Sequence, residues 1–207
     1  MKGKMKKLLI FGAGDGGREI LRILINDINA KTPTWEVLGF VDDMWIDNHC
    51  PELNKSEKGI DAAVDGYSIF GLKYFKNSKN IYGICGIMSP CLRKKVIKAE
   101  IEERGFQLAS IVHPNAIIAD DFVEKPGIVI FPNVSISYNV KVGRGVFINY
   151  NSVLGHDVTI GNYTTISPSS TINARSCIGN NCSIGSGATL IPNIKVEDNA
   201  LIGAGST

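Results

Sequence analysis

An aliphatic residue recurs at every sixth position through the second half of the chain. From Val112 to Ile202 only Glu124 breaks the series. Four positions after each aliphatic residue stands a mostly small or β-branched one, such as Val146 or Ser152. Neither the 3.6-residue period of a helix nor the alternation of a simple strand gives this pattern. It predicts a parallel β-helix, in which each repeat buries its apolar face by stacking on its neighbours.

The same stretch carries regularly placed glycines and asparagines. Glycine often directly follows the aliphatic position, as at Gly143, Gly155 and Gly161, and we expect it to supply the backbone conformations of the corners. We also expect the asparagines to be turn residues, because Asn tolerates a left-handed backbone. These asparagines are Asn149, Asn151, Asn162, Asn173, Asn180, Asn181, Asn193 and Asn199.

The first half of the chain has a different pattern. An apolar run, Lys7–Phe11, leads into the glycine-rich turn 12–17, and a helical pattern with Ile20, Leu21 and Leu24 on one face follows. Strand, glycine turn and helix is the context that a nucleotide-binding turn requires. The next predicted strand, Trp35–Asp43, ends in Asp42 and Asp43. Open α/β sheets bind ligands at that end of their strands.

The remaining N-terminal segments predict a small parallel sheet with right-handed crossovers. In order, we expect a surface loop over 44–66, a turn over 67–71, a short helix over 72–75, a strand over 80–86, a helix from Pro90 to about Arg104, and a strand over 108–112. The predicted fold class is therefore an α/β Rossmann-like parallel sheet in residues 1–111, followed by an all-β β-helix in residues 112–207. The chain stops in mid-repeat with no visible cap, so we expect a truncated C-terminal end, or one that partner subunits cover.

Composition narrows the function classes. A net charge of +2 in 207 residues gives no argument for bulk binding to nucleic acid or to a membrane surface. No apolar segment approaches the ~18–20 residues of a spanning helix, and no signal peptide is recognisable. The five cysteines include no CxxC pair, which favours reduced thiols in a cytoplasmic protein.

One histidine within the repeats stands out as a candidate base. His156 is two residues after an inward-pointing position, so we expect it at or just past a corner with its side chain outward, and Asp157 follows it directly. A nearby carboxylate raises the basicity of an imidazole, which suits a general base. A surface His–Asp pair without a role explains the spacing equally well.

The order of several motifs resembles one family. Residues 12–18 (GAGDGGR), 41–43 (VDD), 111–114 (IVHP), the hexapeptide run and 155–157 (GHD) together look like the sialic acid O-acetyltransferase family of sugar acyltransferases, which includes the bacterial UDP-amino-sugar N-acetyltransferases. The resemblance covers nearly the whole chain apart from residues 44–66. It implies a left-handed β-helix, a homotrimer, acetyl-CoA in the groove between neighbouring β-helices, and a nucleotide-linked sugar on the N-terminal domain.

The resemblance also implies roles for single residues. His156 matches the catalytic base and Asp157 the acid that raises its basicity. Acetyl-CoA contacts, largely through the main chain, fall at Thr165, Ala174, Ser186 and Ala204. The sugar nucleotide would be bound around the glycine turn and the strand ends, at Gly14, Asp15, Gly16, Asp42, Asp43 and Gly86. The chain departs from its relatives at Gly16 and at Thr165, where they often have histidine, and no metal is expected.

Five functions remain open on the sequence. N-acetylation of a UDP-linked amino sugar is the first choice, and O-acetylation of sialic acid or another sugar is the closest alternative. An NAD-dependent sugar oxidoreductase would use the glycine turn, but the chain has no Tyr-x-x-x-Lys pair. A zinc enzyme of the γ-carbonic-anhydrase type would need several histidines between subunits, and a non-catalytic nucleotide-sugar-binding scaffold would need none.

Overall fold

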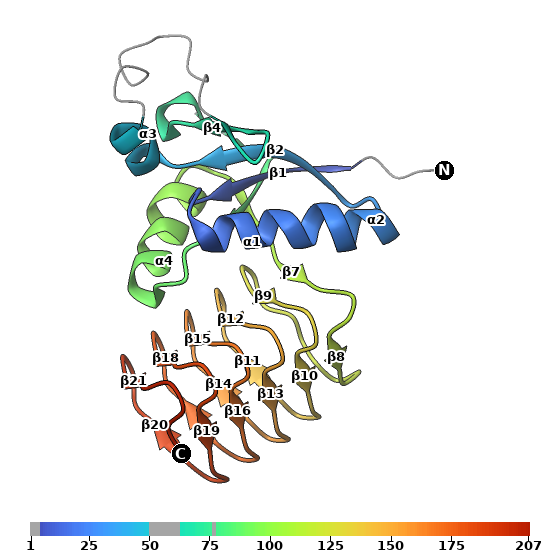
Figure 1. The fold of residues 1–207 in the computed structure, drawn as a ribbon, viewed down its shortest axis with the longest axis vertical. Helices are drawn as coiled ribbons and strands as arrows, with labels where there is room; N and C mark the ends of the chain where they lie inside the picture. Colours follow the sequence, from blue (N-terminus) through green and yellow to red (C-terminus); the bar gives the residue numbers. More distant parts are fainter. Residues whose placement is uncertain (1–4, 50–62, 76–77) are drawn as a thin grey trace. The chain divides into compact units, whose positions relative to one another are not determined.

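The computed structural model describes residues 5–49, 63–75 and 78–207. Its contacts divide the chain into two units (Figure 1). The N-terminal unit comprises Met1–Ile87 and Lys95–Ala109, and the second unit comprises Met88–Lys94 and Ser110–Thr207. The main division therefore lies two residues before the boundary drawn from the sequence, and a short segment around residue 90 joins the second unit.

The N-terminal unit is built on one six-stranded sheet in the order β3-β4-β2-β1-β5-β6. Its strands are β1 (Lys6–Phe11), β2 (Trp35–Val41), β3 (Ala63–Val64), β4 (Tyr67–Phe70), β5 (Tyr82–Cys85) and β6 (Gln107–Leu108). All neighbouring pairs run parallel except β3 with β4. The central strand β1 is buried from Leu8 to Phe11, as expected where helices cover both faces of a parallel sheet.

The helices follow the strands as the sequence indicates. They are α1 (Asp15–Ile23), which continues through the π-helix η1 (Leu24–Ile28) into α2 (Asn29–Lys31), then α3 (Asp43–His49), the 3₁₀-helix η3 (Leu72–Tyr74), and α4 (Pro90–Val96), which continues into the π-helix η4 (Ile97–Glu102). Pro90 occupies the first position of α4, where its missing N–H costs nothing. Within the described part of the chain, no helix is both long and apolar enough to cross a membrane.

Three sequence expectations for this unit were wrong. Of the region 44–66, residues 50–62 lie outside the described part of the chain. The described part is not simply a loop: α3 begins it, because the Asp42 carboxylate accepts a hydrogen bond from the Trp45 N–H at 2.9 Å and so caps the helix. Residues 67–70 form a strand rather than a turn. The turn lies before them at Asp65 and Gly66, whose φ angles of 52° and 82° give the left-handed pair that a tight hairpin needs.

The third error concerns residues 108–112, which do not form one strand. Gln107–Leu108 (β6) pairs with β5 in the N-terminal unit, whereas β7 (Ile111–Val112) pairs with β9 (Val129–Ile130) in the second unit. Residues 108–112 are mostly apolar in sequence, but the two ends of this run pair with strands of two different sheets.

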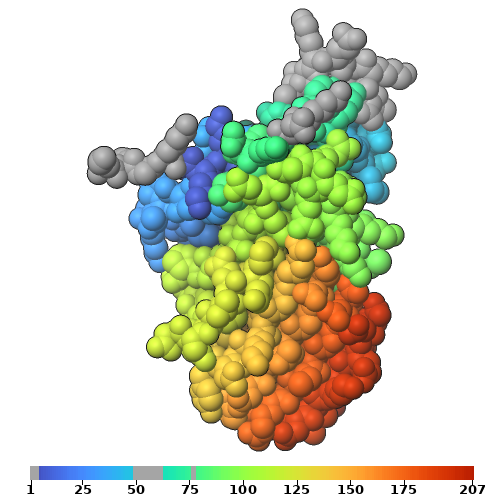
Figure 2. Space-filling model, turned by 180° about the vertical axis from the view of Figure 1, so that it is seen from behind, coloured from blue at the N-terminus to red at the C-terminus, as the bar shows by residue number. Residues whose placement is uncertain are grey.

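The second unit is a left-handed parallel β-helix with two-residue strands on three sides. Its strands are β7 (Ile111–Val112), β8 (Ile117–Ile118), β9 (Val129–Ile130), β10 (Ser135–Ile136), β11 (Lys141–Val142), β12 (Phe147–Ile148), β13 (Val153–Leu154), β14 (Thr159–Ile160), β15 (Thr165–Ile166), β16 (Thr171–Ile172), β17 (Cys177–Ile178), β18 (Ser183–Ile184), β19 (Thr189–Leu190), β20 (Lys195–Val196) and β21 (Leu201–Ile202). Paired strands are 18 residues apart, as for Phe147 and Thr165, so three hexapeptides make one coil. Figure 2 shows the coils as successive bands along this unit.

The hexapeptide pattern predicts the core correctly. The aliphatic positions from Ile130 to Val196 are all buried and form one cluster along the axis of the β-helix. The small or β-branched residues four positions after each aliphatic residue fill the remainder of the core, and Ser152 and Thr164 among them are fully buried. Glu124 breaks the pattern because the described stretch 119–128 holds no strand, so its side chain lies exposed.

The corners follow a simpler rule than expected. Every sixth residue from Gly127 to Gly205 has a positive φ, whether it is glycine or not. Asn151 and Asn181 are among these corner residues, but the glycines that directly follow the aliphatic positions are not. Those glycines serve close approach instead. A Cβ on Gly155 would lie 2.8 Å from the main-chain N of Ala174 in the next coil.

Candidate active site

His156 and Asp157 form a hydrogen-bonded pair at a corner of the β-helix, between β13 and β14. The imidazole Nδ1 lies 2.7 Å from Asp157 Oδ2, and each side chain is about one-third exposed, at 34% and 35%. Asp157 is a corner residue with φ of 62°, a conformation that Asp adopts more readily than most residues. The corner thus lets two adjacent residues direct their side chains at one another.

The charge state of the pair follows from this geometry. A carboxylate can only accept hydrogen bonds, so Nδ1 of the neutral imidazole carries the proton and Nε2 holds the lone pair. The hydrogen bond to His156, with a second one from Asn139, lowers the pKa of Asp157 below its usual range. Asp157 therefore stays ionised, and the pair can accept a proton at Nε2.

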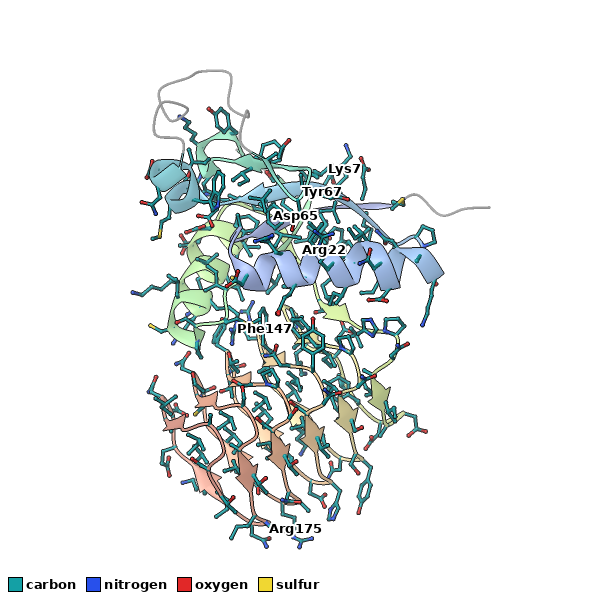
Figure 3. All side chains as sticks on the ribbon, in the orientation of Figure 1. Lys7, Arg22, Asp65, Tyr67, Phe147 and Arg175 are labelled. Carbon is teal, nitrogen blue, oxygen red and sulfur yellow. The ribbon has the colours of Figure 1, made fainter. Side chains whose placement is uncertain are left out.

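Three neighbours of the pair were not identified from the sequence. Tyr138 stacks on His156 with ring centroids 5.1 Å apart and planes within 4°, and Asn139 Nδ2 donates to Asp157 Oδ1 at 2.6 Å. Arg175 lies at the corresponding corner of the next coil (Figure 3), and its N–H donates to the His156 carbonyl at 3.0 Å. All three could have been found by stepping 18 residues from the pair, which is one full coil.

Three of the four residues expected to contact acetyl-CoA lie at corners. Ala174 is one coil after His156 at the same corner, where it is half-buried. Ser186 and Ala204 are both exposed and lie at a different corner, after β18 and β21. The chain therefore brings Ala174 next to the His156 corner and places the other two elsewhere on the β-helix.

Thr165 is placed differently, on a flat side in β15, where it is 6% exposed. Its N–H pairs with the Cys182 carbonyl at 2.9 Å, its hydroxyl donates to the Met88 carbonyl at 2.8 Å, and it accepts a hydrogen bond from Arg93 Nη2 at 2.9 Å. These contacts all lie within the second unit. They occupy the Thr165 side chain and N–H, so the structure adds no support for a contact with acetyl-CoA at this residue.

Arg93 explains why this side of the β-helix is buried. Its guanidinium is fully buried 4.3 Å from the Phe147 ring centroid, and it donates to the carbonyls of Gly145 and Tyr163 at 2.8 and 2.6 Å. Hydrogen bonds to several carbonyls compensate the cost of removing the cation from water. The segment Met88–Lys94 is thereby anchored to the β-helix.

The glycine turn lies at the carboxyl ends of β1 and β5. Gly17 and Gly86 allow α1 to approach the sheet: a Cβ on Gly17 would collide with the Gly12 carbonyl, and one on Gly86 would lie 2.5 Å from the Gly17 Cα. Gly16 is buried in the first turn of α1. Gly14 differs, since a Cβ there would meet nothing within 4 Å. Its main chain is open, as close approach of a ligand requires.

Of the two aspartates after β2, Asp42 contacts the glycine turn, and both accept hydrogen bonds from main-chain N–H groups. Asp42 Oδ2 accepts the Ala13 N–H at 2.8 Å, and Asp43 Oδ1 accepts the Leu72 N–H at 3.0 Å. Asp15 is exposed in the first turn of α1. On the same helix, Arg18 and Arg22 form ion pairs with Asp65 at 3.1 and 3.2 Å, two of whose members are marked in Figure 3.

Among the residues that the structure describes, no three His, Cys, Asp or Glu side chains gather closely enough to hold a metal ion. His113, the other histidine of the second unit, uses Nδ1 to accept the Asn115 N–H at 3.1 Å.

Comparison with known proteins gives a family match for the repeats and similar solved structures for the whole fold. The model of the bacterial transferase hexapeptide (six repeats) matches residues 139–174 and 178–207. No curated protein sequence matches the chain significantly.

The similar structures share about a fifth of their residues with this chain. PerB from Caulobacter crescentus, solved with CoA and GDP-perosamine, has a TM-score of 0.80 at 21% identity, covering 98% of this chain and 88% of its own. The acetyltransferase domain of PglB from Neisseria gonorrhoeae FA1090, solved with acetyl coenzyme A, has 0.79 at 20%, covering 98% and 90%. WeeI from Acinetobacter baumannii AYE has 0.80 at 22%, with the same coverage of 98% and 90%. At these identities the likeness establishes the fold.

Proposed function

We propose that this protein is an acetyl-CoA-dependent acetyltransferase whose acceptor is a nucleotide-linked amino sugar. The observation that carries the proposal is the His156–Asp157 pair, whose imidazole Nδ1 lies 2.7 Å from Asp157 Oδ2 at a partly exposed corner of a β-helix whose repeats match those of bacterial transferases. PerB and PglB, which share the fold, were solved with CoA or acetyl coenzyme A bound.

The proposed reaction is direct transfer. The amine nitrogen of the sugar attacks the thioester carbonyl, and His156 Nε2 accepts the proton that the nitrogen loses. The C–S bond then breaks, and CoA leaves as its thiol after taking up a proton. Asp157 stabilises the imidazolium that forms in between, because its carboxylate accepts the Nδ1 proton in a charge-assisted hydrogen bond.

The proposed acetyl-CoA site uses residues of more than one corner. Ala174 lies beside His156, while Ser186 and Ala204 lie at another corner of the same β-helix. A homotrimer, in which different corners of neighbouring chains face one groove, would bring both sets to one ligand. We therefore propose that protomers share the site, with Thr165 outside the direct contacts.

The proposed sugar-nucleotide site is the edge of the N-terminal sheet. Gly14 offers an open main chain at the start of α1, where a helix N-terminus favours an anionic phosphate. Asp42 holds the turn through Ala13, so we assign it a positioning role there. Asp15, Gly16, Asp43 and Gly86 line the same edge. UDP is our first choice of nucleotide, although PerB was solved with a GDP-linked sugar. Such substrates place the reaction in the cytoplasm.

The test is an assay of CoA thiol release with a panel of UDP- and GDP-linked amino sugars and with sialic acids. We expect release with an amino sugar, reduced at least ~100-fold in His156→Ala, the magnitude typical of a lost general base. Unchanged activity in that variant would remove His156 from the mechanism. Release with sialic acid alone would favour O-acetylation, and no release with any acceptor would favour a binding protein.

A further inference from the structure

The coil that precedes the His156–Asp157 pair contacts both of its members. Tyr138 and Asn139 occupy the same corner one coil earlier, each 18 residues before its partner. In the described part of the chain, Tyr138 stacks on the His156 ring and Asn139 donates a hydrogen bond to the Asp157 carboxylate. These contacts stack one coil on the next, and they also act on the orientation of the His156 imidazole and the Asp157 carboxylate.

Asn139 fixes the carboxylate. Its Nδ2 donates to Asp157 Oδ1 at 2.6 Å, which leaves Oδ2 for His156 at 2.7 Å. Asn139 is itself held, because its main-chain N–H donates to Asp121 Oδ2 at 2.6 Å and its φ of 53° belongs to the corner. A carboxylate bound through both oxygens cannot rotate freely about its χ2 bond.

Tyr138 fixes the imidazole. The two rings are nearly parallel, at 4°, with centroids 5.1 Å apart, and Tyr138 is 56% exposed. Offset stacking of this kind favours one orientation of the imidazole plane. A half-exposed histidine would otherwise rotate about χ2, exchanging Nδ1 for carbon next to Asp157.

We propose that Tyr138 and Asn139 are positioning residues that together hold the His156–Asp157 pair in the one geometry that presents the Nε2 lone pair outward. The inference rests on the proposed function for its kinetic consequence but not for its structural one. Neither residue touches the reacting atoms. Each acts through its partner, Asn139 through Asp157 and Tyr138 through His156.

The competing explanation is that Asn139 belongs to a stacking ladder with no catalytic effect. Similar contacts occur elsewhere in the β-helix: Asn133 Nδ2 donates to Asn151 Oδ1 at 3.3 Å, also across 18 residues. Asn133 has a φ of 59°, so it matches Asn139 in backbone conformation. Asn133→Gly is therefore the matched control for Asn139→Gly, since glycine accepts the left-handed conformation without strain.

The kinetic test compares four variants with the unmodified protein. We expect Asn139→Gly to lower kcat about tenfold, as for loss of a hydrogen bond to a charged group, with KM unchanged. Tyr138→Ala should lower kcat about fivefold through loss of the stacked ring, and Tyr138→Phe should restore it. Asn133→Gly should leave kcat unchanged. A rise in KM at constant kcat would instead make the two residues part of the substrate site, and would overturn the proposal.

A second measurement does not depend on activity. Long-range ¹H–¹⁵N spectra of the imidazole nitrogens report which nitrogen carries the proton, and the chain has only three histidines. We expect His156 in the Nδ1-protonated form and His113, whose Nδ1 is an acceptor, in the opposite form as an internal reference. In Asn139→Gly and Tyr138→Ala, the His156 signals should move toward a mixture of tautomers.

The outcomes separate the two proposals. If the unmodified protein transfers no acetyl group, the proposed function fails, and the spectra alone decide whether Tyr138 and Asn139 position the pair. Spectra of His156 that are the same in all variants overturn the positioning role. So does an equal loss of kcat in Asn133→Gly and Asn139→Gly, which would mean that any break in the ladder has the same effect.

Discussion

Both units of the chain place glycine where two backbones approach closely, but they do so in different ways. In the β-helix the same approach recurs, because every coil lies against the next at the strand spacing. In the N-terminal unit each glycine has its own neighbour, as Gly17 has the Gly12 carbonyl and Gly86 has Gly17. A repeated contact can be relaxed by small movements spread over many coils, whereas a unique contact between helix and sheet has nowhere to relax.

Gly17→Ala should therefore be the most damaging of the glycine substitutions. The added Cβ would lie 1.9 Å from the Gly12 carbonyl oxygen, and neither atom can move without moving the main chain. We therefore expect the free energy of unfolding to fall by about 4 kcal/mol or more. Gly14→Ala, with open space around its Cβ, should cost less than about 1 kcal/mol. Denaturant unfolding followed by tryptophan fluorescence suits this test, because the chain's two tryptophans, Trp35 and Trp45, both lie in the N-terminal unit.

The same pair of variants also tests the proposed nucleotide site. If a ligand approaches the main chain at Gly14, Gly14→Ala should weaken binding of the sugar nucleotide while the fold stays intact. Equal stability losses at Gly14 and Gly17 would show that the contrast between the two positions is wrong.

Gly155→Ala should have a smaller effect in the β-helix. Its Cβ would be 2.8 Å from the Ala174 N, and the coils can separate slightly, so we expect a loss of about 1–3 kcal/mol. Gly203→Ala, at the last coil, meets only the flexible Ser206 hydroxyl at 3.3 Å and serves as the control. Circular dichroism at the β-sheet band reports both units, so its transition is compared with that of tryptophan fluorescence, which reports the N-terminal unit alone. A cost at Gly155 as large as at Gly17 would contradict the idea that repeated contacts relax.

Glu100 makes the stability of the N-terminal unit depend on pH. Burial raises the pKa of its carboxyl, and the nearby negative charge of Asp43 adds to this effect. An acid whose pKa is raised in the folded state favours folding when it is protonated. As pH rises above the pKa of the unfolded state, near 4.5, the Glu100 carboxylate therefore opposes folding. Glu100→Gln should thus stabilise the unit at pH 7 by less than about 1 kcal/mol, and the gain should vanish near pH 4. A loss of stability at pH 7 would refute this.

Asp157 should show the opposite and smallest dependence, because it is exposed. Its pKa is lowered by His156 first and Asn139 second, so its contribution to stability is present above its unfolded value near 3.8 and is lost as pH falls through the folded value. Asp157→Asn should be slightly less stable than the unmodified protein at neutral pH and equal to it at strongly acidic pH. Thermal unfolding at pH 7 and pH 2.5 would detect this. A difference that persists in acid would point to packing instead.

The β-helix core could be predicted almost completely from the sequence. Each inward position faces the same environment in every coil, so a single residue pattern repeated many times averages out local exceptions. The conformation of the corners was predicted less well. Gly155 was expected to supply a special backbone angle, but the left-handed position is two residues later, at Asp157, where the chain does not use glycine. Glycine alone does not distinguish conformational need from lack of space.

For the N-terminal unit, the sequence predicted most of the helices and strands but not the contacts of individual residues. The glycine turn, Asp42 and Gly86 do meet at one edge of the sheet, as parallel strands require. The capping of α3 by Asp42 and the hairpin at Asp65 were missed, although Asp is a common helix cap and the Asp65-Gly66 dipeptide is itself a hairpin signal. Tyr138 was also missed in the β-helix, although counting one coil back from His156 would have found it.

The spacing of 18 residues between stacked side chains has a consequence for how such a chain can change length. Deleting one residue between Tyr138 and His156 would shift the hexapeptide phase of everything that follows, turning inward side chains toward solvent and moving the base off its corner. Deleting a whole coil instead would shorten the β-helix by about 4.8 Å and leave every corner aligned. The distance along the axis between His156 and a contact such as Ser186 can therefore vary only in discrete steps, and the chain can accommodate a longer or shorter ligand only one coil at a time.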